Sequence, residues 1–411
     1  MSGIASSPVD PFAPDFLMDP YPAYEALRAI GPVFALERYG VWAMAGYAEV
    51  EPALKDWKTF ISGEGVGLNG MNPALPKPLT LQIDPPDHDK GRRVLGRTLS
   101  PGVARKLRET FQKEAEKKVS ELIDKGTFDA VVDLAEAYPM KVFPDAIGIR
   151  PDGREKLLAW STFVFNSFGP ENEILTASRQ EGLAAQSWIM ECCGRDALRP
   201  DSLGMMIYQA ADEGEITEHE ATHLVRPFLT AGVDTTVNGI GNTLLALAMH
   251  PHEYRKLHHR PELARNAFEE SLRYDSPVQT FFRTTSRDVE IGGGMIPAHR
   301  KVLLFMAAAK PRSGALGQAR LFRCGARCDR ACRLRRRHPR LRRSDDRAPR
   351  RRVDLRRARK AREDHRAHGG AEAQAQQFPA RAREHAGPGD GGLTASHLVA
   401  VGYCRLLSRL R

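Results

Sequence analysis

Apolar residues recur at helical spacing through most of residues 1–309. Residues 217–249 form the longest such run, and Thr217 with Glu220 fits a capping box, which satisfies N–H groups of the first helical turn. Shorter helices are predicted over residues 20–30 and 261–274. Residues 102–124 place one apolar stripe on a helix face, made of Leu107, Phe111, Ala115, Val119 and Leu122.

Strand-like patterns are confined to two short regions. Residues 34–50 combine β-branched and aromatic residues around a glycine, which predicts a small hairpin followed by a helix. Residues 281–305 predict two or three short strands, with Gly292–Gly294 as the turn. We therefore expect a mainly α fold with small β-sheets (α+β) over about residues 10–309.

The helical pattern stops near residue 309. From Lys310 to Arg411 the sequence contains no Ile, Met, Trp or Asn, and it carries 28 Lys and Arg against 9 Asp and Glu. The whole chain has a net charge of +10, so residues 1–309 have a balance of −9. This composition predicts a globular domain over residues 1–309. Residues 310–411 are predicted to be an Arg-rich, disordered segment that does not follow the fold.

Charge and composition also limit the function classes. Arginines neutralise phosphates, so a nucleic-acid-binding protein with a basic arm is one interpretation. We do not favour it, because no aromatic residue is interleaved between positions 323 and 377 and the acidic body offers no basic face by composition. The sequence has no long apolar run, no signal-like N-terminus and no disulfide-type cysteine spacing, which predicts a cytoplasmic protein without a membrane span.

Two motifs lie in the predicted helices. AGVDTT, residues 231–236, is poor helix material because threonine hydroxyls bond back to carbonyls and loosen the turn, which often opens a groove at a functional site. A packing glycine with satisfied threonines explains the segment equally well. Glu270 and Arg273 are spaced i,i+3 and can form an ion pair, although such pairs are common on surfaces.

Three further cations have defined positions. His88 and Arg92 are four residues apart in DPPDHDKGRR, so a helix that begins after the double proline points both side chains the same way. Arg283 lies on the first predicted strand of residues 281–305, where its guanidinium can take a carboxylate bidentately. Directed donors suit a bis-carboxylate ligand, and a surface basic patch is the alternative.

The order and spacing of these motifs, completed by IPA-x-x-KV at residues 296–302, resembles the cytochrome P-450 family over roughly residues 10–309. The likeness is greatest to soluble bacterial members. It implies the family's fold, a heme cofactor and a monooxygenase that inserts one oxygen atom of dioxygen into a small organic substrate. The implied roles are heme propionate binding for His88, Arg92 and Arg283, a heme-facing helix at Ala231 and Gly232, proton relay by Asp234 and Thr235, and a structural pair in Glu270 and Arg273.

The resemblance extends to substrate and partners. Residues 60–72 and 162–169 match segments that line the family's pocket, and Phe165, Arg226 and Phe228 are the implied pocket residues. The substrate implied is a small aromatic acid whose carboxylate Arg226 would meet, although Glu64 would oppose an anion there. The implied partners are a ferredoxin and a ferredoxin reductase as electron donors, and we expect a monomer.

One essential feature of the family is missing. Its heme iron is bound by a cysteine thiolate in a motif FGxGxHxCxG, which this sequence lacks. Cys324, Cys328 and Cys332 lie in RCGARCDRACR without that context, and we do not favour a helical metal site formed by the three.

A shifted reading frame supplies the motif. Read one base onward with wobble bases chosen freely, residues 330–350 become GHVGFGAGIHACVGQMIARLE, with the cysteine at Leu341. In the same frame residues 316–329 become W-D-K-P-D-x-F-D-V-A-R-D-A-T, which resembles the segment before the family's heme loop. We therefore predict a frameshift near residues 307–314, from a sequencing error or a real mutation. The alternative is that the chain as written is an inactive product or pseudoenzyme.

Overall fold

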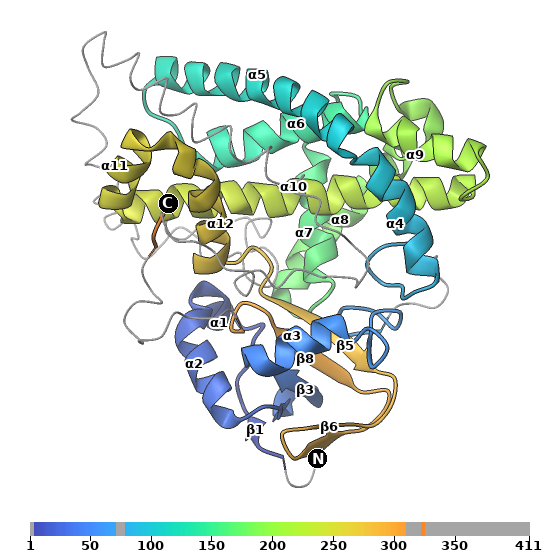
Figure 1. Cartoon of the computed structure of the whole chain (residues 1–411), viewed down its shortest axis with the longest axis vertical. Coiled ribbons are helices and arrows are strands. Elements are labelled where there is room, and N and C mark those ends of the chain that lie inside the picture. The colour runs from blue at the N-terminus through green and yellow to red at the C-terminus, as the bar shows by residue number, and fades with distance from the viewer. Residues whose placement is uncertain (1–3, 71–78, 310–321, 325–411) are drawn as a thin grey trace.

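The structure is a computed structural model that describes residues 4–70, 79–309 and 322–324. Figure 1 shows a large helical part, crossed by the long helix α10, above a smaller part built on a β-sheet. The helices are α1 (Pro14–Met18), α2 (Pro20–Ile30), α3 (Tyr47–Lys55), α4 (Asp87–Thr98), α5 (Pro101–Lys125), α6 (Ala137–Ile147), α7 (Lys156–Asn166), α8 (Glu173–Cys192), α9 (Leu203–Asp212), α10 (Glu218–Met249), α11 (Pro251–His259) and α12 (Ala264–Tyr274).

Short 3-10 turns and one π-helical segment connect some of these helices. The 3-10 turns are η1 (Glu37–Tyr39), η3 (Arg195–Ala197) and η4 (Pro261–Leu263), and the π-helical segment is η2 (Ala130–Glu136). The helix predicted from Pro261 therefore begins as a 3-10 turn and becomes α-helical at Ala264. Among the described residues, no helix is both long and apolar enough to cross a bilayer.

Helix α10 organises the helical part. Its N-terminus has the predicted capping box: Thr217 N donates to Glu220 Oε2 at 2.7 Å, and Glu220 N donates to Thr217 Oγ1 at 3.1 Å. One apolar cluster joins α10 to α5, α6 and α12 through Phe111, Tyr138, Val233 and Phe268. A second cluster packs α10 against α4, α7, α8 and α9. Because α10 is covered on both sides, its central residues are withdrawn from water.

The smaller part is a six-stranded mixed sheet in the order β1-β2-β3-β8-β5-β4. The predicted hairpin is present: β2 and β3 are antiparallel, with Phe34 opposite Ala43. Strand β3 pairs in parallel with β8, which places Trp42 beside Val302. The strands are β1 (Ser6–Ser7), β2 (Phe34–Leu36), β3 (Val41–Met44), β4 (Phe60–Ile61), β5 (Thr280–Thr285), β6 (Val289–Ile291), β7 (Gly294–Ile296) and β8 (Lys301–Phe305).

Residues 281–305 contain four strands rather than the predicted two or three. Strands β5 and β8 belong to the large sheet, whereas β6 and β7 form a separate hairpin. Its turn contains Gly292 and Gly293 at φ 58° and 79°, a conformation that favours glycine. The glycine run therefore marks the turn correctly, but it belongs to an additional hairpin.

Three residues beyond the predicted domain boundary pack on the helical part. Phe322 is 1% exposed and lies in a cluster with Leu257 of α11 and Ala267 of α12. Its ring meets that of Tyr274 edge-on, with centroids 5.9 Å apart. The packed body therefore includes Phe322–Cys324, which the predicted boundary at residue 309 left out.

Candidate functional site

The AGVDTT segment lies in the middle of α10. Asp234 is 4% exposed and Thr235 is half-buried. Thr236 Oγ1 donates to Gly232 O at 2.8 Å, which is the back-bonding that the sequence suggested. The segment is assigned to the α-helix from Glu218 to Met249 without a break. Gly232 faces Phe143 of α6, and the side chain of Ala231 is not among those described.

Helix α4 carries the two predicted cations with four-residue spacing. It begins at Asp87, directly after Pro85 and Pro86, as the sequence predicts. His88 and Arg92 are both half-buried, and burial lowers the pKa of Arg92. His88 Nδ1 lies 3.7 Å from Asp89 Oδ1, whereas Arg92 has no hydrogen bond or ion pair with any described residue. Arg92 therefore remains able to bind an anion.

Arg283 is the most deeply buried of the predicted cations. Its side chain on β5 is 4% exposed, and burial lowers the pKa to about 10, an effect that the Asp84 carboxylate partly offsets. Nη1 donates to Phe282 O at 2.8 Å, and within the described residues the guanidinium forms no ion pair. Asp84 also lies just before α4, and His88 N donates to Asp84 O at 3.2 Å.

These surroundings fit the carboxylates of a heme. A guanidinium has five N–H donors, and burying it without an anion costs several kcal/mol in effective terms. Arg283 and Arg92 both lack a carboxylate partner among the described residues. Each of these two withdrawn cations can therefore take a carboxylate, and a heme carries two in its propionates.

Glu270 and Arg273 on α12 form the predicted ion pair. Arg273 Nε and Nη2 each donate to a Glu270 carboxylate oxygen at 2.8 Å, and Glu270 is 2% exposed. The backbone N–H of Arg323 also donates to Glu270 Oε1, at 3.3 Å. The pair is thus buried and joined to a segment more than fifty residues later, unlike the solvated surface pair that the spacing alone allows.

The predicted pocket segments meet in space. Phe165 on α7 lies 5.9 Å from Phe168 between ring centroids, and Phe168 lies 5.7 Å from Phe281 of β5. Leu68 N donates to Phe168 O at 2.8 Å, so residues 62–68 contact the turn after α7. The two segments that the sequence assigned to one pocket therefore come together between the helical part and the sheet.

Arg226 and Phe228 lie on α10. Phe228 packs against the cluster formed by α7, α8 and α9. Arg226 is half-buried and burial lowers its pKa. Its described hydrogen-bond contact is with Met190 Sδ at 3.9 Å, and a thioether is a weak acceptor. No described contact joins Arg226 to Phe165.

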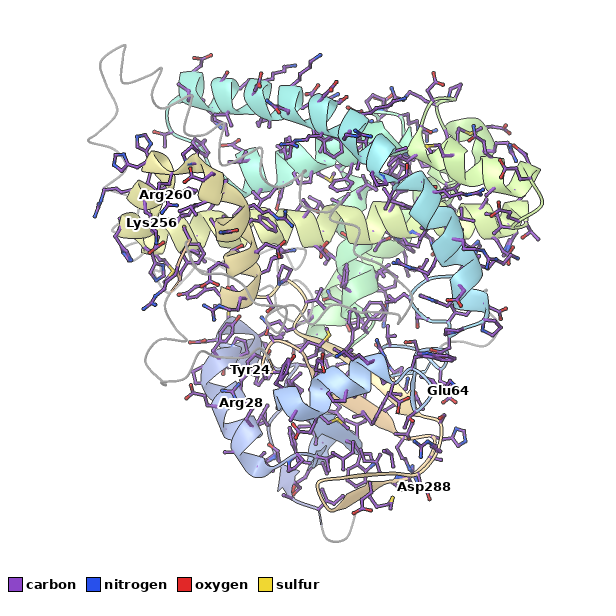
Figure 2. All side chains as sticks on the ribbon, viewed as in Figure 1. Tyr24, Arg28, Glu64, Lys256, Arg260 and Asp288 are labelled. Atoms are coloured by element: carbon purple, nitrogen blue, oxygen red, sulfur yellow. The ribbon has the colours of Figure 1, made fainter. Side chains whose placement is uncertain are left out.

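Glu64 is a partly exposed residue of the sheet part. Its side chain is 45% exposed and lies 3.4 Å from His299 Nδ1. In Figure 2 Glu64 lies at the outer edge of the sheet part. The carboxylate therefore belongs to the surface.

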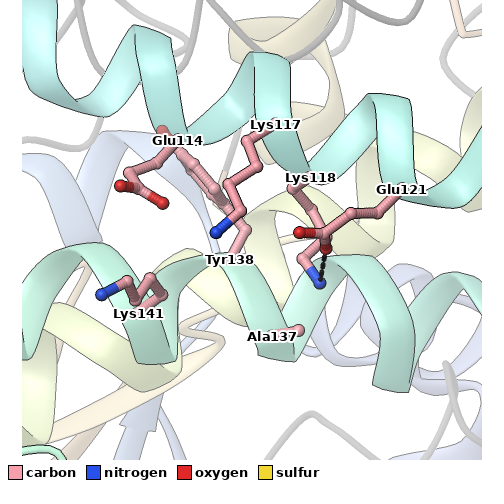
Figure 3. A pocket seen from close by; sticks show the side chains of 7 residues that line it. All are labelled: Glu114, Lys117, Lys118, Glu121, Ala137, Tyr138 and Lys141. Carbon is pink, nitrogen blue, oxygen red and sulfur yellow. Dashed lines mark ion pairs between the residues drawn. The ribbon is translucent and has the colours of Figure 1, made fainter.

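A cavity elsewhere carries none of the predicted site residues. Figure 3 shows this cavity of about 200 Å³ between α5 and α6, lined by Glu114, Lys117, Lys118, Glu121, Ala137, Tyr138 and Lys141. Lys118 and Glu121 pair with each other at 2.9 Å. Because its charges are mixed and largely solvated, it is not the candidate site.

Two residues of the site were missed by the sequence reasoning. Asp84 accepts the N–H groups of Ser62 and Gly63, and Lys301 donates to the carbonyls of Glu64 and Gly65. Asp84 lies in DPPDHDKGRR and Lys301 lies in IPA-x-x-KV. The sequence pattern predicted no role for either residue. Their partners lie 21 to 237 residues away in the chain, so spacing alone gave no signal.

The cysteines give no metal site within the described residues. Cys192, Cys193 and Cys324 are buried and free, and no group of three metal-binding side chains occurs there. Burial raises the pKa of the Cys324 thiol to about 12, and Cys324 N donates to Glu253 Oε2 at 2.7 Å. Cys328, Cys332 and Leu341 lie outside the described residues.

Comparisons with known proteins agree with this arrangement. The cytochrome P450 family model matches residues 194–261. Cytochrome P450 CYP199A2 of Rhodopseudomonas palustris is 47% identical over 312 residues, which are 75% of this chain and 76% of that protein. Vitamin D(3) 25-hydroxylase of Pseudonocardia autotrophica is 31% identical over 312 residues, 73% of this chain and 75% of that protein.

A solved structure shows the same likeness. Cytochrome P450 CYP109Q5 from Chondromyces apiculatus superposes with a TM-score of 0.67 at 28% identity, covering 87% of this chain and 90% of that one. These matches confirm the predicted resemblance, the mainly α fold with small sheets, and heme as the cofactor. The chain therefore belongs to the cytochrome P450 family of heme-dependent monooxygenases.

Proposed function

We propose that this monooxygenase oxidises a small aromatic acid and that Arg226 recognises the substrate carboxylate. Arg226 carries the proposal: it is a half-buried cation on α10 whose described contact is a thioether. An anionic ligand would supply the charge-assisted hydrogen bonds that Met190 cannot. The outward position of Glu64 supports the same substrate class, because it removes the carboxylate that would have repelled an acid.

Three cations would hold the cofactor. Heme, when bound, supplies the activation of dioxygen, while the protein orients the substrate and manages protons. Arg283 and Arg92 would bind the propionates, because each is withdrawn from water without a described carboxylate partner. His88 shares the helix face of Arg92 and would contribute a third donor.

Asp234 and Thr235 would relay protons toward the reaction centre. The buried carboxylate and the neighbouring hydroxyl lie on α10, the helix that runs through the middle of the helical part. Proton transfer by a positioned group contributes about 10²–10⁴-fold to enzymatic rates. In a chain with the frame restored, Asp234→Asn and Thr235→Ala should therefore uncouple electron consumption from product formation, and unchanged coupling would contradict the assigned role.

The C-terminal region would be the out-of-frame reading of the heme-binding loop. The shifted reading puts the missing cysteine at Leu341 and keeps phenylalanine at position 322. Phe322 is 1% exposed and packs on α11 and α12, and the wobble choice that keeps phenylalanine at this position is compatible with that packing. The intact protein would take electrons from a ferredoxin and its reductase and act as a cytoplasmic monomer.

The test is the nucleotide sequence across codons 305–350, followed by expression of two chains. The chain as written should show no thiolate-type Soret shift when reduced under carbon monoxide, because it lacks the cysteine. A chain with one base inserted or deleted near codons 307–314 should show that shift. The shift in the chain as written, or its absence from every restored chain, would refute the frame proposal.

A further inference from the structure

Residues 62–68, which we call the 62–68 loop, connect the two parts of the molecule. Phe282 N of β5 donates to Val66 O at 3.0 Å, and Leu68 N donates to Phe168 O at 2.8 Å. Gly67 lies so close to the turn after α7 that a Cβ would stand 2.9 Å from Phe168 Cα. The loop is therefore pressed between a strand of the sheet and the helical part.

Two charged side chains hold the backbone of four consecutive loop residues. Asp84 Oδ1 accepts from Ser62 N at 2.9 Å, and Asp84 Oδ2 accepts from Gly63 N at 2.7 Å. Lys301 Nζ donates to Glu64 O at 3.0 Å and to Gly65 O at 2.9 Å. Hydrogen bonds to charged groups are stronger than neutral ones, so these four bonds fix the path of the loop.

The position of Lys301 is costly for a cation. Burial lowers the pKa of Lys301 to about 8, the neighbouring Arg283 lowers it further, and the Glu64 carboxylate opposes both effects. Strand β8 is otherwise apolar, since Val302, Leu303, Leu304 and Phe305 are fully buried. An apolar residue would avoid the cost at position 301 but would leave two loop carbonyls without their donor.

We propose that Lys301 is a positioning residue, which sets the 62–68 loop against the turn after α7 and thereby shapes the wall of the substrate pocket. The effect of Lys301 on the pocket wall rests on the substrate pocket of the proposed function. Lys301 acts through the loop backbone and does not touch the reacting atoms. Its removal should therefore weaken substrate binding, seen as a higher KM, and leave kcat nearly unchanged.

The test is amide hydrogen exchange of the full chain, resolved by peptide mass spectrometry. In Lys301→Met the amides of Gly65 and Leu68 should exchange about tenfold faster or more, because two charge-assisted bonds are lost. Amides of α5 should stay within about twofold of wild type. Lys301→Arg keeps the donors and should retain the protection. Lys256→Met, which removes a partly exposed lysine on α11, is the matched control and should leave the loop unaffected.

Three results would overturn the proposal. The first is unchanged loop exchange in Lys301→Met. The second is loss of loop protection in a folded Lys301→Arg. The third concerns Lys301→Gln, which replaces the methionine variant if that protein unfolds: loss of protection throughout the molecule would mean that Lys301 holds the fold rather than the loop.

Calorimetric titration with benzoate separates this inference from the proposed substrate class. If wild type does not bind benzoate, the substrate proposal fails, and exchange alone still decides whether Lys301 holds the loop. If wild type binds benzoate, Lys301→Met should bind it several-fold more weakly. If the loop amides of Lys301→Met exchange faster but the variant binds benzoate as tightly as wild type does, the loop does not belong to the pocket wall.

Discussion

Arg273 on α12 and Arg283 on β5 are both withdrawn from solvent, but their surroundings differ in kind. Arg273 makes two 2.8 Å hydrogen bonds to Glu270, which is itself 2% exposed. Arg283 is 4% exposed and its described hydrogen bond goes to the carbonyl of its neighbour Phe282. The first cation is neutralised by the protein itself. The second forms no ion pair within the described residues, and the Asp84 carboxylate offsets its burial only in part.

We propose that this difference separates a structural charge from a binding charge. Burial penalises an ion strongly, and a matched partner compensates for the penalty only when the geometry is good. The Glu270 and Arg273 pair meets that condition without any ligand, so it serves the fold. Arg283 does not meet it, and neither does Arg92 or Arg226, so these three residues gain most from anions that the protein binds.

Breaking the matched pair should have the largest effect. Glu270→Gln keeps the shape but leaves Arg273 without its anion, and it should lower the free energy of unfolding by about 3–5 kcal/mol. Urea denaturation measures this loss. Glu262→Gln removes one partner of the exposed Arg260 pair and should cost less than about 0.5 kcal/mol. Equal losses for the two variants would show that the α12 pair is no more than a surface contact.

Removing Arg283, the cation without an ion-pair partner among the described residues, should stabilise the fold, whereas breaking the Glu270–Arg273 pair destabilises it. Arg283→Met should raise the free energy of unfolding of the heme-free chain by roughly 1–2 kcal/mol, because it deletes a buried charge that lacks an ion-pair partner. Arg283→Lys keeps a buried charge and should give no such gain. The same urea titration tests both variants. A loss of stability as large as that of Glu270→Gln would mean that Arg283 is already neutralised.

Replacing Arg226 should have a smaller effect, confined to the binding of the substrate carboxylate. Arg226→Met should weaken benzoate binding about fivefold, which is the effect of losing one solvent-accessible charge-assisted interaction of roughly 1 kcal/mol. Arg226→Lys should retain most of the affinity, since it keeps the positive charge. Calorimetry measures both. If both variants bind benzoate as wild type does, the substrate carboxylate lies elsewhere.

The smallest expected effect is the pH dependence of the unfolding free energy that Lys301 contributes. Its folded pKa of about 8 lies below the ordinary value of 10.5, so folding favours the neutral amine. Its contribution to stability is therefore lowest below pH 8 and should rise as the pH increases from 8 to 10.5. The difference in unfolding free energy between wild type and Lys301→Met should rise over the same window. A flat difference would contradict the lowered pKa.

Local features of the molecule were predictable from the sequence. The capping box of α10, the start of α4 after the double proline and the i,i+3 pair on α12 all depend on residues within a few positions of each other. Such contacts follow from helix geometry alone. The apolar stripe of α5 was predictable for the same reason, and all but Leu107 of its five residues are buried.

Long-range features were not predictable in the same way. Nothing in the spacing of Glu270 and Arg273 indicates that the pair is buried, because burial depends on how Phe322–Cys324 pack over α12. The bonds from Lys301 to the 62–68 loop join residues more than 230 positions apart. The extra hairpin was also missed, since a short strand pattern does not reveal which sheet each strand joins.

The parallel pairing of β3 with β8 has a consequence for synthesis. Trp42 pairs with Val302, so the sheet stays incomplete until almost the whole described chain has left the ribosome. At about 5–20 residues per second, the β2–β3 hairpin waits roughly 10–50 s with an open edge, which is a site for aggregation. Strand β8 ends at Phe305, just before the proposed change of frame. Under the proposed change of frame, the ribosome would deliver the last strand of this sheet in the correct frame, and the sheet could close whichever C-terminus follows.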